Sequence, residues 1–147
     1  MEIPLKVFVP SVRTAGPVIW GALLEDCALA QAARANLLLV HVDAELEDFV
    51  ESLLLDRREP MPIWHPGEPL VLPHTAKRMM ILQNVGALTL DEQRRLLAWL
   101  EGPGKRTQIV STSPVSLLPR VEAGTFLDTL YYRLNVVYVD VAARVES

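Results

Sequence analysis

Gly124-Thr-Phe-Leu-Asp-Thr-Leu-Tyr-Tyr-Arg-Leu-Asn-Val136 is the stretch of this sequence that decides the fold. It is long, rich in aromatic residues and rarely produced by composition alone. We expect a helix over roughly residues 126–132, and the apolar run at residues 136–140 predicts the last strand of a sheet. The stretch therefore predicts a short helix that leads directly into a strand.

Strands and helices alternate along the rest of the chain. Continuous apolar runs at residues 37–42 and 79–85 are typical of strands buried on both faces. Further strands are predicted at residues 5–9 and 107–111, and helices at residues 18–35, 44–55 and 89–101. This alternation predicts one α/β domain over residues 1–147, in three αβα layers with a mainly parallel sheet.

Two segments carry local signals of their own. Thr89 and Glu92 form a capping box, because the Thr89 hydroxyl can accept from the third amide of the helix while Glu92 reaches back. Residues 56–73 hold five prolines, which predicts an irregular connection with a short extended piece at residues 69–72. Trp64 and His65 in this connection are candidates for an exposed contact, although packing in the core or a rigid loop explains them equally well.

Composition limits the possible partners and the compartment. The net charge is −4 and the basic residues are scattered, so we expect no direct nucleic-acid partner. Cys27 is the single cysteine and is predicted to be a small buried residue. No signal peptide and no apolar run long enough for a membrane helix is visible, so we expect a cytoplasmic protein without a membrane partner.

The C-terminal stretch resembles G-x-F-R-x-D-L-Y-Y-R-L-N-V, a signature of the sigma-54-dependent transcriptional activators, a branch of the AAA+ ATPases. The resemblance is strongest over residues 79–140 and includes a family helix pattern, Q-x-x-L-L-x-x-L, which is matched here by Gln93, Leu96, Leu97 and Leu100. It implies a P-loop NTPase/AAA+-like fold. Because the sequence ends at Ser147, we expect it to lack the family's helical lid subdomain.

The family's nucleotide-binding positions are altered in this chain. Gln83 and Asn84 stand where the family has an Asp-Glu pair, so the charge for magnesium and the carboxylate for the attacking water are both missing. In the segment compared with the P-loop, residues 11–17, Gly16 is kept but Pro17 replaces the lysine. Ser113 occupies the sensor position. We therefore expect no ATPase activity, no cofactor and weak or absent phosphate binding.

Part of the arginine signature is kept. The first family arginine is Leu127 and the second is Arg133. Leu127, Tyr131, Tyr132 and Arg133 are thus candidates for a partner surface, while the alternative is that Arg133 anchors the neighbouring aromatic residues. His41, expected in a strand, His65 and His74 show no metal-ligand spacing. The acidic residues between 43 and 51 are typical of the solvent-facing side of a helix, so no metal site is predicted.

These observations favour a non-hydrolysing AAA+-like protein-interaction module in sigma-54-type transcriptional regulation. Its expected partner is a protein, such as an intact sigma-54 activator or a second copy of this chain. The alternative is a switch that binds ATP or ADP without hydrolysis, for which Gly16 and Arg13 are the only support. An active ATPase would need another acid near Gln83, and Asp91 is a poor candidate because it is expected in the first turn of the next helix.

Overall fold

The computed structural model describes residues 5–8, 17–54 and 61–141, with side chains from residue 25 onward. Six strands and five α-helices, together with a short 3-10 helix at Val85–Ala87, make up this part of the chain. In order they are β1 (Leu5–Phe8), α2 (Pro17–Ala33), β2 (Leu37–Val40), α3 (Ala44–Leu54), β3 (Ile63–Trp64), β4 (Met79–Leu82), α4 (Leu90–Glu101), β5 (Gln108–Ser113), α5 (Leu118–Glu122), α6 (Asp128–Leu134) and β6 (Val137–Asp140).

All six strands form one parallel sheet in the order β1-β6-β2-β5-β4-β3. β2 lies inside the sheet between β6 and β5, whereas β1 and β3 are the two edge strands. The predicted parallel sheet is confirmed. The order of strands in the sheet differs from their order in the chain. This is possible because each connection crosses over the sheet through at least one helix or long loop.

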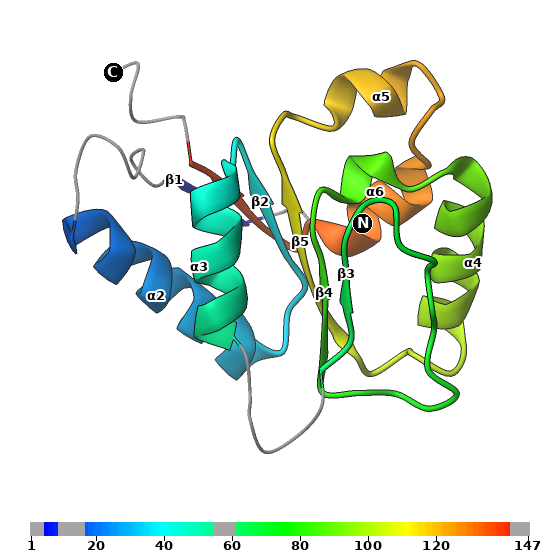
Figure 1. Cartoon of the computed structure of the whole chain (residues 1–147), viewed down its shortest axis with the longest axis horizontal. Helices are drawn as coiled ribbons and strands as arrows, with labels where there is room; N and C mark the ends of the chain where they lie inside the picture. Colours follow the sequence, from blue (N-terminus) through cyan, green and yellow to red (C-terminus); the bar gives the residue numbers. More distant parts are fainter. Residues whose placement is uncertain (1–4, 9–16, 55–60, 142–147) are drawn as a thin grey trace.

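Side chains that alternate along the strands build two cores, one on each face of the sheet. Leu38 and Val40 pack with α4 and α6 on one face, and Leu37 and Leu39 pack with α2 and α3 on the other. Figure 1 shows these helix pairs on opposite sides of the strands. β2, β4 and β5 are buried along their whole length, which the apolar runs predicted for β2 and β4 but not for the more polar β5. The three-layer αβα fold is therefore confirmed.

α4 is held to the chain segment before α6 by one buried side chain, Gln93. Its amide nitrogen donates to the carbonyls of Leu88 and Thr125, both at 3.0 Å, and its oxygen accepts from the Leu127 N–H at 2.8 Å. The predicted capping box is also present: Thr89 accepts from the Glu92 N–H, and the Glu92 carboxylate accepts from the Thr89 N–H. Gln93, the first residue of the Q-x-x-L-L-x-x-L pattern, thus connects that helix directly to the stretch at residues 124–136.

Cys27 is buried on the α2 side of the sheet, as predicted. Burial raises the pKa of its thiol to about 12, with a further contribution from the neighbouring Asp26 carboxylate. The thiol is therefore protonated near neutral pH and behaves as a small apolar side chain.

Some local features differ from the predictions or were not predicted. The proline-rich connection contains a two-residue strand, Ile63–Trp64, which pairs with β4 and was not predicted, and residues 69–72 belong to no strand. Of the alternatives for Trp64, packing in the core is confirmed: the side chain is buried and donates to the Glu68 carbonyl. His41 follows β2 in a left-handed conformation (φ 60°) instead of lying in the strand. α5 was not predicted.

Replacing Gln93 by leucine is expected to lower the free energy of unfolding by roughly 2–4 kcal/mol, because two carbonyls and one N–H lose their partner in a mostly buried place. Urea denaturation followed by circular dichroism measures this. The matched control is Arg94→Ala, an exposed position on the same helix, for which a change within about 0.5 kcal/mol is expected. Equal stabilities of the two variants would contradict the bridging role of Gln93.

Candidate functional site

The carboxyl ends of all strands lie at one edge of the sheet, since the strands are parallel. Ligands of open α/β sheets bind at this edge, between neighbouring strands whose connections leave in opposite directions. β2 and β5 meet this condition, because β2 leads into α3 toward β3, while β5 leads through α5 and α6 back to β6 on the other side of β2. The candidate site is therefore built from the turns after β2, β4 and β5.

The turn after β2 is short and acidic. Only His41, Val42 and Asp43 separate β2 from α3, whereas a phosphate-binding loop uses about eight residues. Asp43 caps α3 itself, because its carboxylate accepts from the Leu46 N–H at 2.8 Å. Glu45 and Glu47 lie in the first turn of α3. The amide that would face an anion at this helix end is thus already bonded to a carboxylate.

The strand order separates the two halves of the predicted nucleotide site. Gly16 lies outside the described residues, and Pro17 is the first residue of α2, after the edge strand β1. Between β1 and β5 lie β6 and β2, which places β1 roughly 14 Å from β5 at the usual strand spacing. The strand that precedes residues 11–17 is therefore not next to the strands that carry Gln83 and Ser113.

Gln83, Asn84 and Ser113 do lie together at the carboxyl edge. Gln83 directly follows β4, is buried, and donates from its amide to the Glu51 carboxylate. Asn84 has a left-handed backbone (φ 50°) and donates its N–H to the Thr112 hydroxyl at 3.1 Å. Ser113 ends β5, but its hydroxyl donates to the carbonyl of Val115 in its own turn at 2.6 Å. The predicted strand-end positions are thus neighbours: the Gln83 amide and the Ser113 hydroxyl are hydrogen-bonded within the protein, and Asn84 is held through its N–H.

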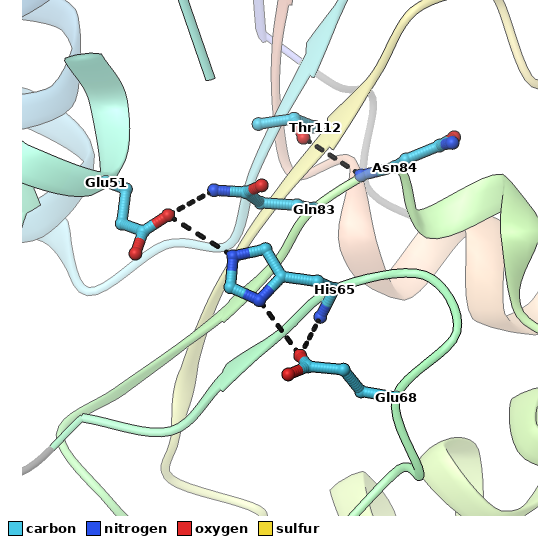
Figure 2. Close-up of polar contacts among 6 residues, drawn as sticks. All are labelled: Glu51, His65, Glu68, Gln83, Asn84 and Thr112. Carbon is cyan, nitrogen blue, oxygen red and sulfur yellow. Dashed lines mark hydrogen bonds and ion pairs between the residues drawn. The ribbon is translucent and has the colours of Figure 1, made fainter. Parts of the chain in front are cut away.

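A cluster of charged side chains beside Gln83 was missed by the sequence analysis. Figure 2 shows the His65 imidazole between two carboxylates: Nδ1 lies 2.9 Å from Glu68 and Nε2 lies 3.4 Å from Glu51. Glu51 comes from α3, His65 and Glu68 from the turn after β3, and Gln83 from the end of β4. The cluster therefore links three separate chain segments, and His65 is its shared member.

The prediction that the acidic residues of α3 all face solvent was wrong for two of them. Glu47 and Glu51 are half-buried against the sheet edge, one helical turn apart. Burial raises the pKa of Glu47, as does the nearby Asp48, while His65 and a hydrogen bond to Thr112 act against this. The available signal was their four-residue spacing next to the buried Leu46 and Val50, which places them beside the apolar face of α3.

These side chains give the site limited chemistry. A carboxamide at Gln83 cannot act as a general base near neutral pH, and the hydrogen bonds of His65 tie the imidazole to two carboxylates. Within residues 25–54 and 61–141, no three His, Cys, Asp or Glu side chains are arranged to hold a metal ion. The contacts of Glu51 with His65 and Gln83 connect α3 to the turns after β3 and β4.

The predicted partner surface is only partly exposed. Tyr131 is buried and packs in the core with its ring edge-to-face against Tyr132, so it cannot contact a partner. Leu127 is half-buried at the start of α6. Tyr132 is 47% exposed, and Arg133 is exposed with one guanidinium nitrogen 3.4 Å from the Leu100 carbonyl. The accessible part of this surface is therefore Tyr132 and Arg133, flanked by Leu127.

Solved structures of NtrX from Brucella abortus are similar to this chain. The ATP complex has a TM-score of 0.61 at 15% identity over 84% of this chain and 35% of that one. The ADP complex has a TM-score of 0.60 at 15% identity over 90% and 37%. No protein-family model and no curated protein matches the sequence.

The chain thus spans little more than a third of the NtrX chains. Identities this low establish the fold alone, which is the three-layer P-loop NTPase/AAA+-like α/β fold. None of the helices in the described part of the chain is long and apolar enough to span a membrane.

The His65 cluster predicts a pH-dependent contribution to stability. Hydrogen bonds to Glu68 and Glu51 raise the pKa of His65 above 6.5, with Glu47 also nearby. The folded state therefore binds the His65 proton more tightly than the unfolded state does. This binding stabilises the folded state at pH values below 6.5, and the stabilisation is lost as the pH rises through the raised pKa. Relative to His65→Asn, the wild type should be more stable at about pH 6 than at about pH 8.5 in urea denaturation.

The matched control for this pH effect is His74→Asn, because His74 is an exposed histidine in the same connection. The side chain of His65 is 42% exposed, so solvent screening keeps the effect small. A stability difference between wild type and His65→Asn that stays constant with pH would contradict the role of the two carboxylates.

Proposed function

We propose that this chain is a non-hydrolysing AAA+-like module that acts through protein contacts in sigma-54-type transcriptional regulation. The observation that carries the proposal is the three-residue turn between β2 and α3. In a P-loop protein the strand-to-helix connection wraps a triphosphate with backbone amides and a lysine. Here it has no room for that loop, and no lysine.

Electrostatics at this edge support the same proposal. Asp43, Glu45 and Glu47 surround the start of α3, and Glu51 lies further along the same helix. Negative charges at this end of a helix cancel the positive end of its dipole, which would otherwise favour a phosphate. An ATP molecule entering here would meet carboxylates where it needs cations, so binding is disfavoured before hydrolysis is considered.

The contact between Gln83 and Glu51 supports the loss of hydrolysis. In the sigma-54 activators that the sequence resembles, the position of Gln83 is an acid that serves the magnesium site. An acid at this position of the present chain would face the Glu51 carboxylate, and two adjacent carboxylates cannot both stay ionised without a large pKa shift. The Gln83 amide donates a hydrogen bond to Glu51, so this position contributes to packing and not to a metal site.

Purified protein is expected to show no magnesium-dependent binding of ATP and no release of phosphate. Calorimetric titrations with ATP, with and without magnesium at equal ionic strength, measure the binding, and a phosphate-release assay measures hydrolysis. Magnesium is the informative variable because a P-loop site binds the triphosphate together with the ion.

The second candidate is a switch that binds ATP or ADP without hydrolysis, which the ATP- and ADP-bound NtrX neighbours favour. Binding that becomes tighter with magnesium, without phosphate release, would support this switch and overturn the leading proposal. Phosphate release would overturn both.

The proposed partner surface is Tyr132 and Arg133 on α6. Both residues are exposed, and tyrosine and arginine are among the residue types enriched where binding energy concentrates at protein interfaces. A sigma-54 activator from the source cell is the preferred partner, and a second copy of the chain is the other one considered.

In affinity capture from the native cell, the wild type should retain an intact sigma-54 activator. The double variant Tyr132→Ser, Arg133→Ala should lose at least about tenfold in affinity for that protein, corresponding to roughly 1.4 kcal/mol. Arg94→Ala, an exposed arginine on α4, is the matched control and should bind like the wild type. Full binding by the double variant would eliminate this surface, and capture of metabolic enzymes alone would count against the proposed function.

A further inference from the structure

A pocket with a volume of about 330 Å³ lies at the amino-terminal edge of the sheet, opposite the candidate site. Its walls come from the connections that lead into β2, β5 and β6, and from the ends of α4 and α6. Three cationic side chains line it: Arg34, Lys105 and Arg133. A volume of this size is in the range of small-molecule pockets. The pocket is separated from the acidic carboxyl edge by the length of the strands.

The charge of the pocket is not balanced by acids. No carboxylate lines it, and the ion pairs among residues 25–54 and 61–141 involve none of its three cations. The carboxyl ends of α2, α4 and α6 are close, and each contributes about −0.5 of an elementary charge. Three cations against roughly −1.5 leave a surplus of about +1.5. The negative helix ends therefore neutralise only part of the positive charge of the pocket.

The backbone at Arg34 supports a role for its side chain. Arg34 follows α2 with φ 53°, in the left-handed conformation that usually holds glycine or asparagine after a helix. The hydrogen bond from the Ala35 N–H to the Ala30 carbonyl at 3.0 Å closes this helix end. An arginine here is conformationally unfavourable. Its presence is explained if the guanidinium has a ligand to bind.

The floor of the pocket is rigid. Asn36 accepts from the Ile109 N–H and donates to the Arg133 carbonyl, both at 2.8 Å, which joins β5 to the end of α6. Arg133 also lies near the Leu100 carbonyl. The backbone segments that carry Arg34 and Arg133 are thus joined by hydrogen bonds, and the exposed cationic side chains extend from them.

We propose that this pocket binds a small organic phosphate. Its cations offer only hydrogen-bond donors, which suits a ligand group that only accepts, and guanidinium groups match phosphate oxygens in geometry. The half-buried Val136 adds apolar wall area for the organic part of the ligand. The proposal goes beyond the proposed function, because it needs neither magnesium nor a protein partner. Arg133 is shared with the proposed partner surface, so the test uses Arg34 and Lys105, which are not part of that surface.

Isothermal calorimetry on the whole chain tests this with two probes, inorganic phosphate and phenyl phosphate, against chloride at equal ionic strength. Phenyl phosphate is expected to bind more tightly than inorganic phosphate because its ring can cover Val136. Both affinities should fall as salt is raised. Absence of saturable binding of phenyl phosphate at low salt would overturn the proposal.

Two variants assign the binding to the pocket. Lys105→Gln and Arg34→Asn should each weaken phenyl phosphate about tenfold, since each removes one charge-assisted contact. Asparagine tolerates the left-handed backbone, so Arg34→Asn should also keep or raise the melting temperature. Arg106→Gln is the matched control, because this exposed arginine adjoins Lys105 but does not line the pocket. Equal losses in Lys105→Gln and Arg106→Gln would reduce the effect to general surface charge and overturn the site.

This test is independent of the nucleotide test. ATP bound through this pocket would be weakened by Lys105→Gln and by magnesium, which neutralises its phosphates. ATP bound at the carboxyl edge would be strengthened by magnesium and unaffected by Lys105→Gln.

Discussion

Burial of the central strands on both faces is the constraint on which the rest of the structure depends. β2, β4 and β5 have no solvent-facing side, so helices must cover each face. Polar chemistry is consequently confined to the two ends of the strands. The two ends differ in charge: α3 brings Glu47 and Glu51 to the carboxyl edge, whereas Arg34, Lys105 and Arg133 gather at the amino edge. A sheet of this class normally offers an anion site where its strands end, and this one is acidic there.

Local structure was predictable where the signal is local. The apolar runs of β2 and β4, and the capping box of α4, depend on a few consecutive residues, and the structure confirms them. Strand order is not local, because pairing depends on distant segments. Nothing in residues 5–9 indicates that β1 is an edge strand, or that β2 takes the inner position beside β5. A two-residue strand such as β3 is too short for any periodicity.

The candidate site was predictable to the same extent. The family resemblance predicts Gln83, Asn84 and Ser113 as parts of one site, and they lie together in the structure because they end or follow neighbouring parallel strands. The contact of Glu51 with Gln83 and His65 was not, because it requires the orientation of α3 relative to the turn after β3. For Tyr131 and Tyr132, adjacent aromatic residues on a helix face different directions, so one is buried and its neighbour exposed. A signature motif alone does not separate these roles.

The state of Cys27 has a practical consequence for studying the molecule. It is the single cysteine of the chain, its side chain is buried, and burial raises its thiol pKa to about 12, so the thiol is protonated at neutral pH. Maleimide or spin-label reagents will therefore leave the native chain essentially unmodified. A cysteine introduced on the surface becomes a uniquely labelled position without removing Cys27 first, so fluorescence and paramagnetic distances can be measured on an otherwise unaltered protein.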